Sequence, residues 1–148
     1  MRKTAILSAM LLLFFGCRNS GDNNEAARST ALQWATAYFN YDFHEAADYC
    51  TPESERWLRF AASNATSHDL ELLQGRQAAA EVEQLLVTGD TSAVAIVRVS
   101  DYVVPATFSQ PSSIAEEDGI FRIPLVRNNG NWRVRMEGLP RSERQSRD

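Results

Sequence analysis

The sequence predicts an α+β fold, in which helices of the first half pack against an antiparallel sheet formed by the second half. Three observations carry this prediction. Apolar residues recur at helical spacing up to about residue 61. β-branched residues gather in residues 91–104. Asn129-Gly130, the pair most compatible with a type I′ hairpin, separates two apolar stretches near the C-terminus. Helices and strands segregated along the chain in this way are typical of the α+β class.

Residues 1–16 have the form of an export signal. Basic Arg2-Lys3 is followed by an apolar stretch at positions 5–15 and by the small residue Gly16, which are the three parts of a secretory signal peptide. The apolar stretch covers about 11 positions, fewer than the roughly 20 that a helix needs to span a bilayer. A transmembrane anchor is therefore not expected in this segment.

Cys17 is the expected lipidation site. It follows Phe14-Phe15-Gly16 and resembles the lipobox of bacterial lipoproteins, with the departure that Phe14 stands where Leu is commonest. Two or more acyl chains are enough for stable membrane anchoring. The resemblance implies a lipid-anchored protein of the bacterial cell envelope, facing the periplasm or the cell exterior. The alternatives are an ordinary signal peptide with a chance cysteine, and an unprocessed buried helix.

Composition limits what the part after residue 16 can bind. It carries 13 arginines, no lysine and 19 acidic residues, a net charge of −6. This balance argues against a nucleic-acid partner and against electrostatic attraction to anionic lipid. Polar residues 17–24 predict a flexible tether, and charged residues 140–148 predict a disordered tail. One α+β domain is expected between them, at 25–139.

Three helices are expected in the first half of this domain. Asp22 and Glu25 have the spacing of a capping box. The apolar positions that follow recur every three or four residues: Ala27, Ala31, Trp34, Ala35, Tyr38 and Phe39. Asn40-Tyr41 breaks this helix, and Asp42 with Glu45 repeats the capping pattern before a short second helix. Thr51-Pro52-Glu53 predicts the start of a third helix, because a hydroxyl that can cap the helix is followed by a proline and by an acid near the positive end of the helix dipole.

An antiparallel sheet of about four strands is expected in the second half. The predicted strands lie at 78–87, 91–104, 120–126 and 132–136. In the last one, apolar Trp132, Val134 and Met136 alternate with charged residues, so one face is expected to be buried and the other wet. Residues 105–118 predict a long loop, and loops of that length are uncommon unless functional or mobile.

Several short motifs resemble one known superfamily. They are the run YDFHEAADYCTPES at 41–54, Gly89-Asp90-Thr91-Ser92-Ala93-Val94, and Gly130-Asn131-Trp132-Arg133-Val134. Over residues 25–137 the chain resembles the nuclear transport factor 2-like superfamily (the cystatin-like cone), including small bacterial lipoprotein domains of unknown function. The resemblance implies a cone-shaped fold, in which a curved sheet wraps around the long first helix and leaves a cavity at its open end. It also implies dimerisation across the open sheet face. It does not define an activity, because the superfamily includes both enzymes and binding proteins.

Four aromatic residues are the candidates to line this cavity: Trp34, Tyr38, Trp57 and Tyr102. Apolar cavities with a few polar groups are the default sites for small ligands. Aromatic residues at helical spacing are more often plain core, and both interpretations stay open at this point. Cys50 is expected to be a small buried apolar residue rather than a reactive thiol.

No residue is assigned a catalytic role, and no metal or cofactor is expected. His44 and His68 fall in polar, solvated stretches. Asp101-Tyr102, at a strand end, is the least unattractive pair of acid and hydroxyl, although a solvated Asp101 is the more common outcome. The sequence has no zinc-ligand spacing, glycine-rich phosphate loop or nucleophile elbow.

Two functions of different class follow. The favoured one is a non-catalytic envelope lipoprotein whose cone binds a small apolar ligand or an envelope protein. It predicts a cavity without buried ionisable groups and an exposed apolar edge around residues 105–114. The alternative is a small isomerase, dehydratase or hydrolase. It predicts that Asp101, or another acid, is buried in the cavity beside Tyr102 with a raised pKa.

Overall fold

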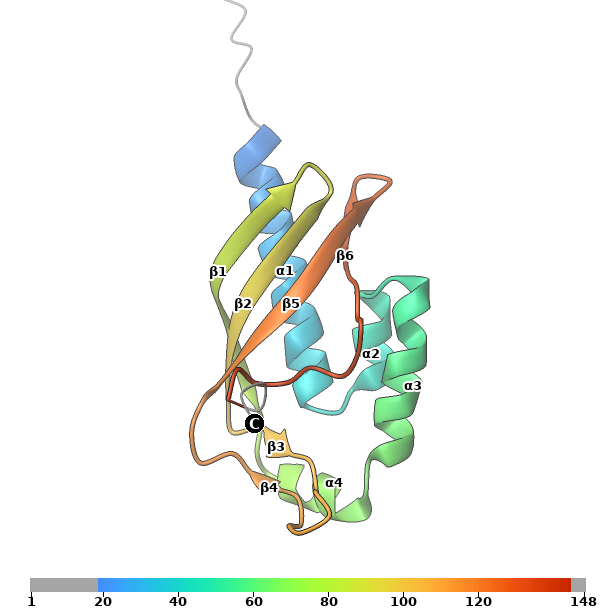
Figure 1. Ribbon diagram of the computed structural model, residues 1–148, viewed down its shortest axis with the longest axis vertical. Coiled ribbons are helices and arrows are strands. Elements are labelled where there is room, and N and C mark those ends of the chain that lie inside the picture. The colour runs from blue at the N-terminus through green and yellow to red at the C-terminus, as the bar shows by residue number, and fades with distance from the viewer. Residues whose placement is uncertain (1–18, 145–148) are drawn as a thin grey trace, which may run out of the picture.

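The computed structural model describes residues 19–144, and the expected signal peptide and Cys17 lie outside these residues. The helical elements are α1 (Asn19–Phe39), α2 (Phe43–Asp48), the 3₁₀ turn η1 (Pro52–Ser54), α3 (Glu55–Asn64) and α4 (Ser67–Leu73). The strands are β1 (Ala79–Gly89), β2 (Ser92–Ser100), β3 (Val103–Val104), β4 (Ser113–Ile114), β5 (Gly119–Asn128) and β6 (Asn131–Val134). The helices precede the strands along the chain, as the sequence predicts (Figure 1).

Strands β1, β2, β5 and β6 form one antiparallel sheet in that order. Helix α1 runs along one face of this sheet and contacts all four strands (Figure 1). Its alanines allow close approach of the helix to the strands. The core cluster joins residues of α1, β2 and β5, among them Ala27, Ala31, Trp34, Val97, Val99, Ile123 and Leu125. The predicted α+β class, with helices packed on an antiparallel sheet of about four strands, is confirmed.

The turn between β5 and β6 is the one that the sequence predicts. Asn129 and Gly130 have φ angles of 51° and 80°, and a type I′ hairpin needs positive φ at both central residues. Asn128 pairs with Asn131 across the turn. The local sequence therefore sets the register of this hairpin.

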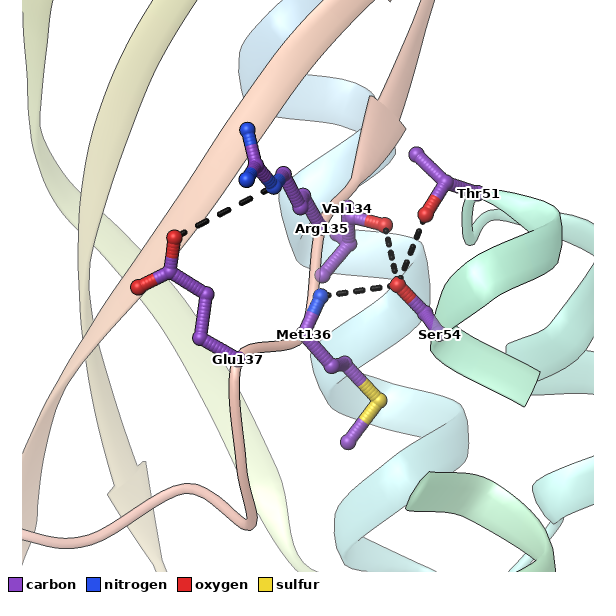
Figure 2. Close-up of polar contacts among 6 residues, drawn as sticks. All are labelled: Thr51, Ser54, Val134, Arg135, Met136 and Glu137. Atoms are coloured by element: carbon purple, nitrogen blue, oxygen red, sulfur yellow. Dashed lines mark hydrogen bonds and ion pairs between the residues drawn. The ribbon is translucent and has the colours of Figure 1, made fainter. Parts of the chain in front are cut away.

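Buried Ser54 connects the start of α3 to the end of β6 (Figure 2). Its hydroxyl oxygen accepts a hydrogen bond from the Met136 amide at 2.8 Å and lies 2.8 Å from the Thr51 hydroxyl. The Thr51 amide donates to the Val134 carbonyl at 2.9 Å. These bonds take Met136 out of the strand pairing, so β6 ends at Val134 rather than at the predicted 136.

The N-terminal end of α1 differs from the expectation. Helix α1 spans Asn19–Phe39, so the predicted flexible tether at 17–24 is wrong for residues 19–24, and the box at Asp22 and Glu25 does not start the helix. The side chain of Asn23 explains the order of this turn. Its Oδ1 accepts a hydrogen bond from Trp132 Nε1 at 2.8 Å, a tertiary contact that composition does not indicate.

Two further elements were not expected. The predicted strand 91–104 is interrupted at Asp101, which has a φ of 55°, and continues as β3. Strand β3 pairs with β4 inside the predicted loop 105–118. Helix α4 is a fourth α-helix where the sequence predicts three.

The expected disordered tail at 140–148 is ordered over residues 140–144. Strand β6 pairs only with the second half of β5, from Leu125 onward. The free edge of the first half is taken by the tail, where Ser142 forms an antiparallel bridge with Phe121 and the Glu143 amide donates to Ile120 at 3.0 Å. An unpaired strand edge in the domain explains why a charged segment is held here.

Candidate functional site

An apolar cavity of about 400 Å³ lies at the end of the domain where β3, β4 and α4 are found. This is the end opposite the first turn of α1 (Figure 1). Its lining residues are Tyr38, Phe39, Tyr41, Phe43, Phe60, Ala61, Asn64, Ala65, Thr66, Asp69, Tyr102, Val103, Pro105, Ala106, Phe121, Leu139 and Pro140. Three larger hollows, of about 440, 590 and 610 Å³, are each lined in the majority by polar and charged residues. The apolar cavity is therefore the candidate site for a small ligand.

Interlocked aromatic rings form one wall of the cavity. The ring centroids of Phe39 and Phe121 are 4.6 Å apart, and Tyr102 meets Phe121 edge to face at 5.3 Å. Tyr102 also meets Phe39 at 5.7 Å. Since α1, the β2–β3 connection and β5 each supply one ring, the wall is held by three elements and is largely preformed.

The turn after α1 supplies a further part of the cavity lining, Tyr41. Tyr41 adopts a left-handed conformation with φ of 63°, and the Asp42 amide donates to the Ala37 carbonyl at 2.9 Å to close the helix end. A left-handed non-glycine residue costs roughly 1–2 kcal/mol. The Tyr41 ring packs against Phe43, with centroids 5.2 Å apart, and this contact helps to hold the strained turn with Tyr41 in the cavity wall.

Asp69 is the only charged residue among the cavity-lining residues in the described part of the chain. It belongs to a capping box, in which Thr66 Oγ1 accepts from the Asp69 amide at 3.1 Å and Asp69 Oδ2 accepts from the Thr66 amide at 2.9 Å. Only 5% of its surface is exposed. Among the described residues its other oxygen, Oδ1, has no hydrogen-bond partner of ordinary geometry, although the Ser112 hydroxyl lies near the carboxylate. The prediction of a cavity without buried ionisable groups is therefore wrong.

The surroundings of Asp69 keep it ionised. Burial by itself raises the pKa of Asp69, but the nearby Ser112 hydroxyl, the contacts with Thr66 and the charge of His68 lower it more, to below its ordinary value of 3.8. Burial and then the Asp69 charge raise the pKa of Tyr41 to about 12. At neutral pH the cavity therefore combines a carboxylate with an un-ionised Tyr41 hydroxyl.

Gly119 lies where Tyr102 and Phe121 approach the backbone of β5. A Cβ atom there would stand 2.7 Å from both the Tyr102 hydroxyl oxygen and Phe121 Cε2. We expect Gly119→Ala to lower the free energy of unfolding by about 1–3 kcal/mol through overpacking, measured by urea denaturation. Gly138→Ala is the matched control, because nothing lies within 4 Å of its added methyl group. Equal stability of the two variants would contradict the prediction.

Of the four predicted pocket residues, the structure brings two to the cavity. Tyr38 and Tyr102 line it. Trp34 does not: it is 1% exposed in the core, it stacks on Tyr38 with centroids 4.9 Å apart, and its indole N–H donates to Cys50 Sγ at 2.9 Å. Trp57 is half-buried on α3 outside the cavity lining, with Arg56 over its ring.

Cys50 is buried, as expected, and its thiol is held un-ionised. Burial raises its pKa from 9.0 to about 12, opposed by the hydrogen bond from Trp34.

In a Cys17→Ser chain, where Cys50 is the single thiol, we expect iodoacetamide at pH 8 to react at least about 100-fold more slowly with the native protein than with the urea-unfolded protein. Because the folded pKa exceeds the unfolded one, this group's contribution to stability is complete below pH 9 and is lost as pH rises toward 12. Equal alkylation rates would show an accessible thiolate.

The other chemical candidates of the sequence lie outside the cavity. Asp101 is exposed while its neighbour Tyr102 is buried, so the hypothesis that this pair acts together in the cavity is wrong. The left-handed backbone at Asp101 breaks the strand at this point. His44 is exposed on α2, and His68 is an exposed residue of α4 whose Nε2 lies 3.1 Å from the Ser112 carbonyl.

Five aromatic residues and one acid line the cavity although the sequence analysis does not predict them there: Phe39, Tyr41, Phe43, Phe60, Phe121 and Asp69. For Asp69 a signal exists, since Thr66 and Asp69 have the spacing of a capping box and predict the start of α4. For the five aromatic residues no local signal exists, because their common position depends on how the helices and the sheet pack.

The remaining observations limit the possible sites. Within residues 19–144, no helix combines the length and apolarity needed to cross a membrane, and no cluster of three or more His, Cys, Asp or Glu side chains could hold a metal ion.

Comparisons with known proteins find similar solved structures. One is described as a ketosteroid isomerase-like protein from Erwinia carotovora atroseptica SCRI1043; it is 13% identical, the match covers 77% of this chain and 92% of that chain, and the TM-score is 0.49. Another is an Ntf2-like protein involved in plasmid conjugation, 17% identical over 81% of this chain and 48% of that chain, with a TM-score of 0.35. No family model and no curated protein matches the chain. At these identities and TM-scores the likeness carries no conclusion about function.

Proposed function

We propose that this protein is a lipid-anchored lipoprotein of the bacterial envelope whose nuclear transport factor 2-like domain binds a small apolar ligand without catalysis. The observation that carries the proposal is the apolar cavity of about 400 Å³. Ligand sites are typically preformed cavities of about 300–1,000 Å³ with mostly apolar walls and a few polar groups. The aromatic wall of Phe39, Tyr102 and Phe121, with Asp69 and Tyr41 as polar groups, fits this description.

The state of Asp69 favours binding over catalysis. A general acid or base works best with a pKa near the operating pH. Asp69 is the only charged residue among the described cavity-lining residues, and its pKa lies below 3.8. Tyr41, with a pKa of about 12, is also far from neutrality. Neither group suits proton transfer at pH 7.

The position of the cavity fits an anchor at Cys17. Helix α1 spans Asn19–Phe39, a length of about 30 Å at 1.5 Å per residue. Its last residue lines the cavity, so the described chain begins about a helix length away from the site. A lipid on Cys17 would leave the cavity at the end of the domain that faces away from the membrane.

Ligand binding is tested by filling the cavity. Ala61 on α3 lines the cavity, whereas its neighbour Ala62 is exposed and does not. The neutral fluorescent probe N-phenyl-1-naphthylamine is titrated into the full-length chain and its variants. We expect the wild type and Ala62→Phe to bind the probe alike and Ala61→Phe to bind at least about tenfold more weakly, since its ring occupies the site. Absence of binding to the wild type, or unchanged binding by Ala61→Phe, would disprove the proposed site.

Lipid anchoring is tested by metabolic labelling with a palmitate analogue. We expect Cys17→Ser to abolish the label and Cys50→Ser to retain it, because Cys50 is buried inside the domain. Labelling that survives Cys17→Ser would refute the anchor.

A further inference from the structure

We propose that the ligand of this cavity is an organic cation, a quaternary or protonated amine on an apolar body. The inference rests on the proposed ligand binding and adds the chemical class of the ligand. It follows from two features of the lining, which are a buried carboxylate that forms no ion pair among the described residues and a large number of aromatic rings.

The described residues form no ion pair with this carboxylate. Buried ionised side chains are usually paired, yet none of the ion pairs found among residues 19–144 includes Asp69. No lysine or arginine is among the described residues that line the cavity. His68 contributes to the charge balance, but it is an exposed residue of α4 and is not among the lining residues. A cation in the cavity would therefore meet one negative charge and no lining positive charge.

Aromatic rings supply the second feature. Seven lining residues of the described chain are aromatic, contributed by α1, the turn after it, α2, α3, the β2–β3 connection and β5. The faces of aromatic rings attract cations, and quaternary ammonium groups are commonly recognised by aromatic cages. Rings alone would also suit a neutral ligand, so it is their combination with Asp69 that selects for positive charge.

The charge of Asp69 acts on the cavity without a direct bond. Asp69 Oδ1 is buried behind the surface, while the Asp69 charge helps to raise the pKa of Tyr41, another lining residue. The field of the carboxylate therefore reaches the cavity wall. A quaternary ammonium group, which has no N–H to donate, needs only such a field, and an anionic ligand would be repelled by it.

Three matched probes test the inference on the full-length chain by displacement of N-phenyl-1-naphthylamine. They are benzyltrimethylammonium, its uncharged carbon isostere neopentylbenzene, and the anion 3-phenylpropionate. We expect the cation to bind about tenfold more tightly than neopentylbenzene, and the anion to bind most weakly. If neopentylbenzene binds as well as the cation or better, the inference fails while the proposed apolar ligand site stands. If no probe binds and the fluorophore does not either, both fail.

Three variants test whether Asp69 and the aromatic rings cause the preference for the cation over its uncharged isostere. Asp69→Asn is expected to reduce the ratio of cation to isostere affinity several-fold and to leave neopentylbenzene affinity within about twofold. Glu71→Gln removes a charge from the same helix at an exposed residue outside the cavity and should leave the ratio unchanged. Phe60→Leu changes a half-exposed lining residue and provides an independent test. It should weaken binding of the cation and leave binding of neopentylbenzene unchanged. An unchanged ratio in folded Asp69→Asn, or in Phe60→Leu, would overturn the assignment.

Discussion

Replacing Trp34 with alanine is expected to lower the free energy of unfolding by about 3–5 kcal/mol, the usual cost of emptying a buried tryptophan site. Trp34 is 1% exposed and lies in the core between α1 and the sheet. The substitution removes its stacking on Tyr38 and its hydrogen bond to Cys50. Because domains of this size are stable by only about 5–15 kcal/mol, the loss is a large part of the total. Urea denaturation followed by circular dichroism measures it.

Leu32→Ala is the control for the Trp34 prediction. Leu32 is on the same helix and is 39% exposed, so its truncation should cost less than about 1 kcal/mol. A cost for Trp34→Ala no greater than that for Leu32→Ala would show that the indole is not part of the packed core. Since Tyr38 lines the cavity, Trp34→Ala should also weaken binding of the fluorescent probe in the fraction that remains folded.

Replacing Ser54 with alanine is expected to cost about 1–3 kcal/mol, because it leaves a buried donor without an acceptor. The Met136 amide donates to the Ser54 hydroxyl, which also lies at hydrogen-bond distance from Thr51 (Figure 2). Alanine fits the volume but accepts no hydrogen bond. The segment that follows β6 would lose one of its attachments to α3. Urea denaturation measures the total cost, and amide hydrogen exchange at Met136 locates it.

Ser63→Ala serves as the matched control for Ser54. The Ser63 hydroxyl donates to the Phe60 carbonyl at 2.8 Å, but this bond is exposed and water replaces it. We expect a change in stability within about 0.5 kcal/mol and no change in exchange at Met136. Unchanged exchange at Met136 in Ser54→Ala would mean that another acceptor replaces the hydroxyl, and the predicted cost would be wrong.

Local chemistry explains which elements could be predicted. Asp42 caps α2 by accepting a hydrogen bond from the Glu45 amide at 3.0 Å, as the spacing of these two residues predicts. The third helical segment starts at the predicted place, although the Thr51 hydroxyl pairs with the Ser54 hydroxyl instead of capping the helix. Asn129-Gly130 forms the predicted turn. In each case, the interaction that decides the structure joins residues at most three positions apart.

Elements that depend on distant partners were predicted wrongly or missed. The residues before Glu25 are helical, with Asn23 bound to Trp132 more than a hundred positions away. The tail is ordered because the first half of β5 leaves an edge open. The lining of the cavity also depends on segments that are far apart in the sequence. The helix face predicts Tyr38 as a lining residue, but Asp69 reaches the cavity only because α4 packs against β3 and β4.

Local sequence signals were enough to predict the α+β class, the order of helices and strands, the hairpin at Asn129-Gly130 and the acidic charge balance. Periodicity, capping and turn chemistry are local and can be read one segment at a time. The packing of distant segments places Trp34 in the core and Asp101 outside the cavity, and it makes Asp69 the single charged lining residue among the residues described. Burial, cavity lining and charge pairing are properties of several packed segments together, and no single segment specifies them.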